Sequence, residues 1–144
     1  MTHRCEAALI TCEDFRLHQR KDGRNYITDF IEERGVDCDL ITRGGSVQDL
    51  VRPDSEGYRG CLLRDSDVSA RLHGCRVIYL INHQDCGAYG GMAFNDREEE
   101  IEQHISDLKE AREIILESFQ GVTVETFFAY LREDTTDVFD IEQV

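Results

Sequence analysis

The sequence has few basic residues and no long apolar run. Lys and Arg number 16 against 30 Asp and Glu, which gives a formal net charge of −14. Since nucleic acids and anionic membranes bind basic patches, this balance argues against both as partners. No apolar stretch approaches the roughly 20 residues of a membrane span. The polar residues 1–4 lead directly into a predicted strand and make a poor secretion signal, so we expect a cytoplasmic protein.

The sequence also lacks internal repeats and low-complexity segments. With 144 residues and 40% hydrophobic content, it is long enough for one domain with a buried core. Its six cysteines do not resemble a disulfide framework, because Cys5, Cys38, Cys61 and Cys75 stand singly. We therefore expect reduced thiols.

Three short apolar runs, partly β-branched, predict buried strands at residues 7–11, 36–42 and 77–82. Between the first two lies a helical pattern formed by Tyr26, Ile27, Phe30 and Ile31, which Gly35 closes. A strand, a helix and a second strand imply a right-handed parallel crossover.

The second half of the sequence predicts one long helix and further extended structure. Asn95 or Asp96 is placed to cap a helix whose first turn is acidic. Residues 122–131 read as another strand, and the acidic tail from residue 134 is either an edge strand or a segment that docks on a partner. We predict an α/β fold with a mainly parallel sheet of about four strands flanked by helices. The expected buried stripe of the long helix is Ile101, Ile105, Leu108, Ile115 and Phe119.

Cysteine and histidine side chains follow two of the predicted strands. Cys12 comes directly after the first strand, and His83 and Cys86 come directly after the third. In parallel sheets the carboxyl ends of the strands share one edge, so these side chains are expected to meet. Two thiolates and one imidazole are a ligand set for catalytic zinc that leaves its fourth position open.

These residues resemble the zinc motifs of the β-class carbonic anhydrases. The family pattern C-x-D-x-R occurs here as Cys12, Asp14 and Arg16, and H-x-x-C occurs as His83 and Cys86. The resemblance extends over roughly residues 7–91, with the whole chain, 1–144, read as a single zinc domain. The longer form H-x-D-C-G is also present, through Asp85 and Gly87, and Arg43-Gly44-Gly45 is similar to a shortened family loop.

The resemblance implies that Cys12, His83 and Cys86 bind Zn²⁺ and that a zinc-bound hydroxide reversibly hydrates CO₂ to bicarbonate. It also implies a catalytic pair, in which Arg16 holds Asp14 away from the metal and leaves an oxygen to orient the nucleophile. The backbone at Gly44 and Gly45 can approach the site closely and is read as either a substrate loop or a plain turn. Asp85 is expected to fix the turn that carries the last two ligands.

The chain departs from the family in several places. Only six residues precede the first strand where the family has helices that embrace a partner, residues 48–60 form a longer connection, and Phe15 replaces a common serine. Hydrolysis of COS or CS₂ and a non-catalytic role in binding zinc or bicarbonate therefore stay open. We still expect a homodimer or larger homo-oligomer. Residues 61, 73 and 75 (Cys, His, Cys) fit no common metal-site spacing and predict no second site.

Overall fold

Five strands form one sheet in the computed structural model, which describes residues 3–90 and 92–144. Their order across the sheet is β2-β1-β3-β4-β5. The first four are parallel and the last is antiparallel to β4, so the predicted mainly parallel sheet is confirmed, with β5 as a fifth strand beside the roughly four predicted. The strands are β1 (Ala7–Thr11), β2 (Cys38–Thr42), β3 (Val77–His83), β4 (Thr123–Leu131) and β5 (Phe139–Gln143).

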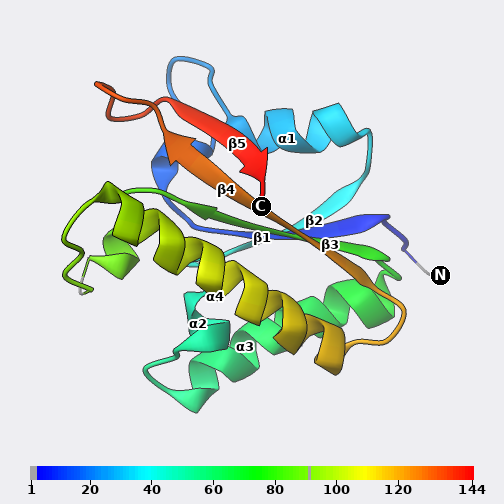
Figure 1. Ribbon diagram of the computed structural model, residues 1–144. Helices are drawn as coiled ribbons and strands as arrows, with labels where there is room; N and C mark the ends of the chain where they lie inside the picture. Colours follow the sequence, from blue (N-terminus) through cyan, green and yellow to red (C-terminus); the bar gives the residue numbers. More distant parts are fainter. Residues whose placement is uncertain (1–2, 91) are drawn as a thin grey trace.

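Helices cover both faces of the sheet (Figure 1). The helix α1 lies on one face, and α2, α3 and α4 lie on the other. Residues 48–60, expected as a long connection, form α2 and the start of α3. The helices are α1 (Tyr26–Arg34), α2 (Gln48–Val51), α3 (Glu56–Asp67) and α4 (Arg97–Ser118), with short turns η1 (Phe15–Leu17), η2 (Val68–Leu72) and η3 (Gly87–Tyr89).

Alternation along the central strands divides the core into two clusters. In β1, Ala8 and Ile10 pack on the side of α2, α3 and α4, whereas Ala7 and Leu9 pack on the side of α1. Every residue of β1 is buried because the strand lies between β2 and β3 and is covered on both faces. This double burial explains why the strand is apolar throughout.

The C-terminal tail forms the edge strand β5. Its first residue, Phe139, is 3% exposed and pairs with Leu131 of β4. The Phe139 ring meets the Tyr26 ring edge-on at a centroid distance of 5.8 Å and the His83 ring at 5.9 Å. Of the two placements that the sequence left open, the tail is therefore an edge strand.

The long helix α4 begins after its cap Asp96, whose side chain accepts a hydrogen bond from the Glu99 amide. Leu108 and Ile115 are buried as predicted, but the apolar stripe is incomplete because Ile101 and Ile105 stay partly exposed. Two polar residues, His104 and Asp107, are buried in this helix instead. The hydrophobic pattern missed them because their burial depends on hydrogen bonds to distant residues.

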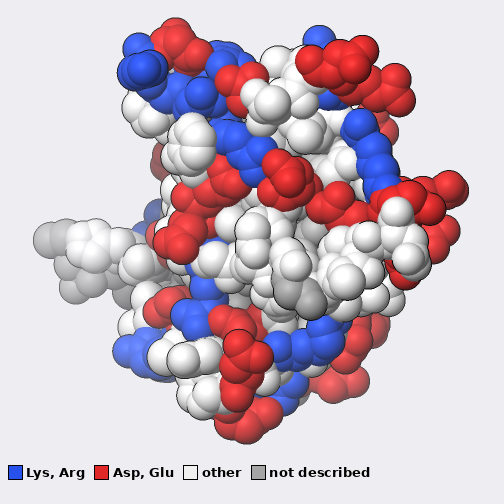
Figure 2. Space-filling model, turned by 90° about the vertical axis from the view of Figure 1, so that its left-hand side faces the viewer, with Lys and Arg blue, Asp and Glu red and all other residues white. Residues whose placement is uncertain are grey.

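Among the residues placed in the structure, no helix has both the length and the apolar composition needed to cross a membrane. Acidic side chains are spread over the molecular face drawn in Figure 2, with basic side chains between them. In the whole sequence, acidic residues outnumber basic ones by 30 to 16, which gives the net charge of −14.

Replacement of a core leucine of α4 should destabilise the fold strongly. Leu108 is fully buried, and Leu108→Ala should lower the free energy of unfolding by about 2–5 kcal/mol because it leaves a cavity. Leu72 is 50% exposed, so Leu72→Ala is the matched control and should change it by less than about 0.5 kcal/mol. Urea denaturation measures both, and equal losses would contradict the assigned core.

Candidate metal centre

Neighbouring parallel strands bring the three predicted metal ligands together. Thr11, the last residue of β1, is in register with Ile81 of β3. Cys12 therefore leaves the sheet beside the end of β3. His83 is the last residue of β3, and the turn to Cys86 follows it. All three side chains are buried, and one donor atom of each lies within 4.8 Å of the others.

The spacing of the two sulfur atoms suits zinc. The Sγ atoms of Cys12 and Cys86 are 3.9 Å apart. Two thiolates bound to one tetrahedral zinc at about 2.3 Å each would be about 3.8 Å apart. The ligand pair thus has the separation that a bound ion requires.

The imidazole of His83 also has a nitrogen available for the metal. Its Nδ1 lies 2.9 Å from the Gln84 carbonyl oxygen, which fixes the proton on Nδ1. The other nitrogen, Nε2, is buried, and no hydrogen-bond partner lies within its reach among residues 3–90 and 92–144. A buried nitrogen without a partner is costly unless a ligand binds it. These residues therefore fit a zinc ion.

The two thiols differ in acidity. The contact with Cys86 lowers the pKa of Cys12 to about 4; burial opposes this shift and His83 contributes to it. The contact with Cys12 and burial raise the pKa of Cys86. One thiolate is therefore stabilised in the pair, and a cation would be needed to stabilise the second.

Arg16 holds the carboxylate of Asp14. Its Nε lies 3.0 Å from Oδ1 and its second guanidinium nitrogen 2.7 Å from Oδ2, while its backbone amide donates to Oδ1 at 2.9 Å. Burial raises the pKa of Asp14, but the hydrogen bonds from Arg16 outweigh it and the pKa is lowered. Oδ2 lies 3.8 Å from Nε2 of His83. In the part of the chain that the structure describes, Asp14 is not among the clustered metal donors.

The same guanidinium reaches the turn from His83 to Cys86, which carries two of the candidate ligands. It donates to the Asp85 carboxylate and to the Asp85 carbonyl, both at 2.8 Å, and to the Thr136 carbonyl at 3.0 Å. Asp85 has a positive φ of 58° inside this turn. A surface cavity of about 540 Å³ lies over Asp14, Arg16 and Asp85.

The residues Gly44 and Gly45 lie beside the turn that carries Cys86. A Cβ on Gly45 would come within 3.1 Å of the Ala88 Cβ and 2.6 Å of Gln48 Oε1, and φ is 79° there. Glycine is therefore required at this position. Gln48 also donates to the Ala88 carbonyl at 3.2 Å. Gly45 and Gln48 thus pack against the residues that directly follow Cys86.

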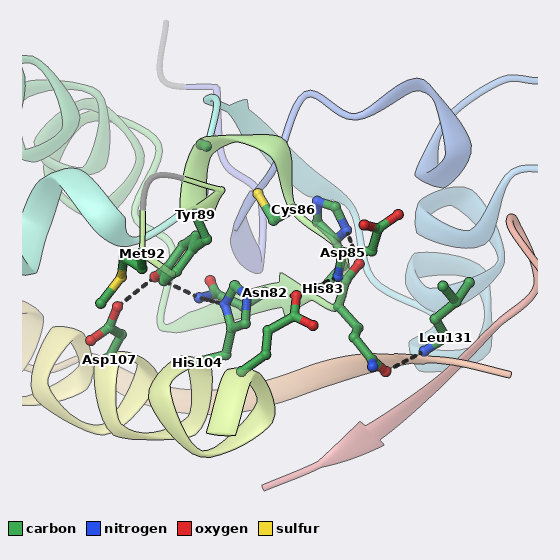
Figure 3. Close-up of polar contacts among 12 residues, drawn as sticks. Asn82, His83, Asp85, Cys86, Tyr89, Met92, His104, Asp107 and Leu131 are labelled. Carbon is green, nitrogen blue, oxygen red and sulfur yellow. Dashed lines mark hydrogen bonds and ion pairs between the residues drawn. The ribbon is translucent and has the colours of Figure 1, made fainter. Parts of the chain in front are cut away.

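Sequence reasoning missed a buried polar cluster between the end of β3 and α4, which Figure 3 shows. Asn82 Nδ2 lies 3.2 Å from the Tyr89 hydroxyl and 3.0 Å from His104 Nδ1. The Tyr89 hydroxyl donates to Asp107 at 2.6 Å, and Asp107 also pairs with Arg52 at 2.5 Å. Tyr89 is therefore a member of this network.

A second contact joins α4 to the turn from His83 to Cys86. The Asp85 amide donates to the Glu100 carboxylate at 2.6 Å, and Glu100 lies 3.8 Å from His104 Nε2. Glu100 and His104 do not belong to a short sequence motif with the candidate ligands, because Glu100 is 15 residues from Asp85. Only the tertiary fold reveals these contacts.

Comparison with known proteins identifies the family. Residues 2–139 match the model of a family described as "Putative carbonic anhydrase". The chain belongs to this family. It is also similar to an uncharacterised protein of Rickettsia conorii, with 29% identity over 140 residues that cover 92% of this chain and 72% of the relative.

Solved structures show that the family fold here is that of β-carbonic anhydrases. A tetrameric β-carbonic anhydrase from Sordaria macrospora matches with a TM-score of 0.62 and 14% identity, covering 99% of this chain and 81% of the other. A carbon disulfide hydrolase matches with a TM-score of 0.50 and 11% identity, covering 90% of this chain and 76% of the other. The resemblance to β-carbonic anhydrases is therefore not limited to the short motifs, because the fold matches over 99% of this chain.

Loss of either candidate thiolate should remove one equivalent of bound zinc. Cys12→Ser and Cys86→Ser each replace a thiolate by a hydroxyl, which is a much poorer zinc ligand, and His83→Ala should act in the same way. Elemental analysis of purified, zinc-loaded protein measures the change. Cys61→Ser is the control because Cys61 is exposed and lies outside the cluster. Full zinc retention in all three ligand variants would overturn the assignment.

Proposed function

We propose that this protein binds Zn²⁺ through Cys12, His83 and Cys86 and catalyses the reversible hydration of CO₂ to bicarbonate. The observation that carries the proposal is the donor set itself: two sulfurs 3.9 Å apart and a buried imidazole nitrogen without a hydrogen-bond partner among the described residues. Membership of the carbonic anhydrase family supports the same reaction. Zinc, when bound, supplies an acidified water as the nucleophile.

Asp14 and Arg16 are the proposed catalytic pair. The three donors on Arg16 use both oxygens of Asp14 and hold the carboxylate beside the cluster of proposed zinc ligands but outside it, with Oδ2 3.8 Å from His83 Nε2. A carboxylate accepts several hydrogen bonds, so Oδ2 retains the capacity to accept a proton from the attacking water. Asp14 then orients that water toward CO₂, and Arg16 keeps Asp14 anionic and in place.

Hydrolysis of CS₂ or COS is the second candidate. These linear molecules place an electrophilic carbon in the same position as CO₂, and the same three ligands would serve. The fold likeness to a carbon disulfide hydrolase supports this candidate at the level of architecture. Phe15, which is 67% exposed, borders the cavity over Asp14. The size of the molecule that this cavity accepts would decide between CO₂, COS and CS₂ as the substrate.

Arg16→Ala tests the catalytic pair. Without the guanidinium, Asp14 is free to turn and occupy the fourth zinc position, so CO₂ hydration should fall by at least about a hundredfold while zinc stays bound. Stopped-flow hydration assays with elemental analysis measure both quantities, and CS₂ and COS are assayed in parallel. Arg24→Ala is the control, because Arg24 pairs with Asp22 and Asp137 and does not contact Asp14.

Asp14→Ala should behave differently from Arg16→Ala. It removes the competing carboxylate as well as the proton acceptor, so partial activity with an altered pH profile is expected. The absorption spectrum of the cobalt-substituted protein distinguishes a carboxylate from water in the fourth position. If the spectrum and turnover of Arg16→Ala match the parent between about pH 6 and 9, the pair is structural. Zinc-loaded parent protein without turnover of CO₂, COS or CS₂ would establish the non-catalytic alternative.

We also propose that the protein forms a homodimer or a larger homo-oligomer. The edge strand β2 exposes Leu40, and Phe15 is exposed next to the site. Exposed strand edges and large apolar side chains favour association. Light scattering at micromolar concentration should give at least twice the chain mass of 16.6 kDa. A monomer would contradict this, and Leu40→Lys should shift a dimer toward monomer if β2 forms the contact.

A further inference from the structure

A second group of metal donors lies at the opposite edge of the sheet, where β1, β2 and β3 begin. Cys5 precedes β1, Asp39 is the second residue of β2, and Cys75 precedes β3. One donor atom of each lies within 4.8 Å of the others. The sequence did not predict this site, because its three residues are 34 and 36 positions apart and only the parallel sheet brings them together.

The geometry points to a second binding site for a thiophilic divalent cation of the zinc type, with Cys5, Cys75 and Asp39 as ligands. The Sγ atoms of Cys5 and Cys75 are 3.1 Å apart, and Asp39 Oδ2 is 4.0 Å from Cys75 Sγ. Zinc would place the sulfurs about 3.8 Å apart and a sulfur and an oxygen about 3.5 Å apart. Side-chain shifts of less than about 1 Å therefore convert the observed arrangement into a coordinated one.

His73 completes this group from the turn before β3. Its Nδ1 lies 2.6 Å from Asp39 Oδ2. Carboxylates that bind metals are commonly held by a further hydrogen bond of this kind, which fixes the oxygen that faces the ion. His73 is thus a positioning residue for Asp39. Cys61 is exposed on α3 and is not in the cluster, in agreement with the sequence analysis, which predicted no metal site from Cys61, His73 and Cys75.

Burial makes the two thiols unlike an ordinary surface pair. Cys75 is fully buried and Cys5 is half-buried, and both donate to the carbonyl of Ala7, at 3.2 Å and 3.4 Å. Burial, together with the contact to Cys5, raises the pKa of the Cys75 thiol. Metal ions bind the thiolate form of cysteine, so cation affinity at this site should rise with pH.

The cation would connect the segment before β1 to the first residues of β2 and β3. Hydrogen bonds already join that segment to its neighbours. The Cys5 amide donates to the His73 carbonyl at 3.2 Å, and Glu6 accepts from the Arg76 amide at 3.0 Å and from the Asp37 amide at 2.9 Å. A bound ion would add three bonds across the amino-terminal edge of the sheet. The proposed site is independent of the candidate active site, because it shares no residue with Cys12, His83 and Cys86.

Zinc counting on two double variants tests the inference. Protein reduced and loaded with Zn²⁺ without oxygen should hold two zinc ions per chain. The variant with Cys5→Ser and Cys75→Ser should hold one, as should the variant with Cys12→Ser and Cys86→Ser, and Cys61→Ser should hold two. Parent protein with one zinc that depends only on Cys12 and Cys86 would overturn the second site. Parent protein with one zinc that depends only on Cys5 and Cys75 would support the second site and would leave the proposed function without its metal.

Cobalt and His73 provide a second readout that does not depend on removing the thiols of the proposed site. In the Cys12→Ser and Cys86→Ser background, Co²⁺ should give thiolate charge-transfer bands, and His73→Ala should weaken zinc affinity about 10- to 100-fold. Circular dichroism checks that each variant is folded. A Cys5–Cys75 disulfide formed in the presence of zinc under reducing buffer, found by mass spectrometry, would overturn the proposal, as would absence of the cobalt bands.

Discussion

The parallel pairing of β1 with β3 is the constraint on which the candidate active site depends. The register of Thr11 with Ile81 places Cys12 opposite the last residues of β3. A slip of one residue would turn every side chain of β1 to the other face of the sheet and carry Cys12 away from His83. Because β1 is buried on both faces, the packing of its small and large side chains fixes this register. The core of the protein therefore positions the candidate metal ligands directly.

Arg16 links this core geometry to the surface of the site. One guanidinium contacts Asp14 after β1, Asp85 after β3 and Thr136 before β5, so it joins three segments that are distant in the sequence. Both Arg16 and Asp14 are largely buried, with side chains 13% and 16% exposed. A partly buried, bidentate pair is worth more than an exposed one and holds one geometry. A bound metal ion would attract the negative Asp14 carboxylate. The Arg16 guanidinium, fixed on the other side of that carboxylate, opposes this attraction.

Local patterns in the sequence were sufficient for much of the fold and for the donor set. Apolar runs predicted β1 at its observed bounds and β3 to within one residue, and Gly35 correctly marked the end of α1 with a φ of 61°. The antiparallel β5 was harder to predict, because its residues alternate between apolar and acidic and are stabilised mainly by pairing with β4. The buried polar residues of α4 were not predicted. The burial of His104 and Asp107 depends on hydrogen bonds with Asn82, Tyr89 and Arg52 rather than on an apolar pattern.

The two thiol pairs at opposite ends of the sheet differ in how far they are organised for a cation. Cys12 and Cys86 already have the sulfur separation of a tetrahedral site, and His83 has its nitrogen free of other partners in the described structure. Cys5 and Cys75 are closer together and both donate to Ala7, so a cation has to separate the sulfurs and replace these hydrogen bonds. Such reorganisation lowers affinity without changing the ligand types. The Cys12–Cys86 pair is therefore expected to fill first as zinc is added, and the Cys5–Cys75 pair to fill at higher zinc concentration.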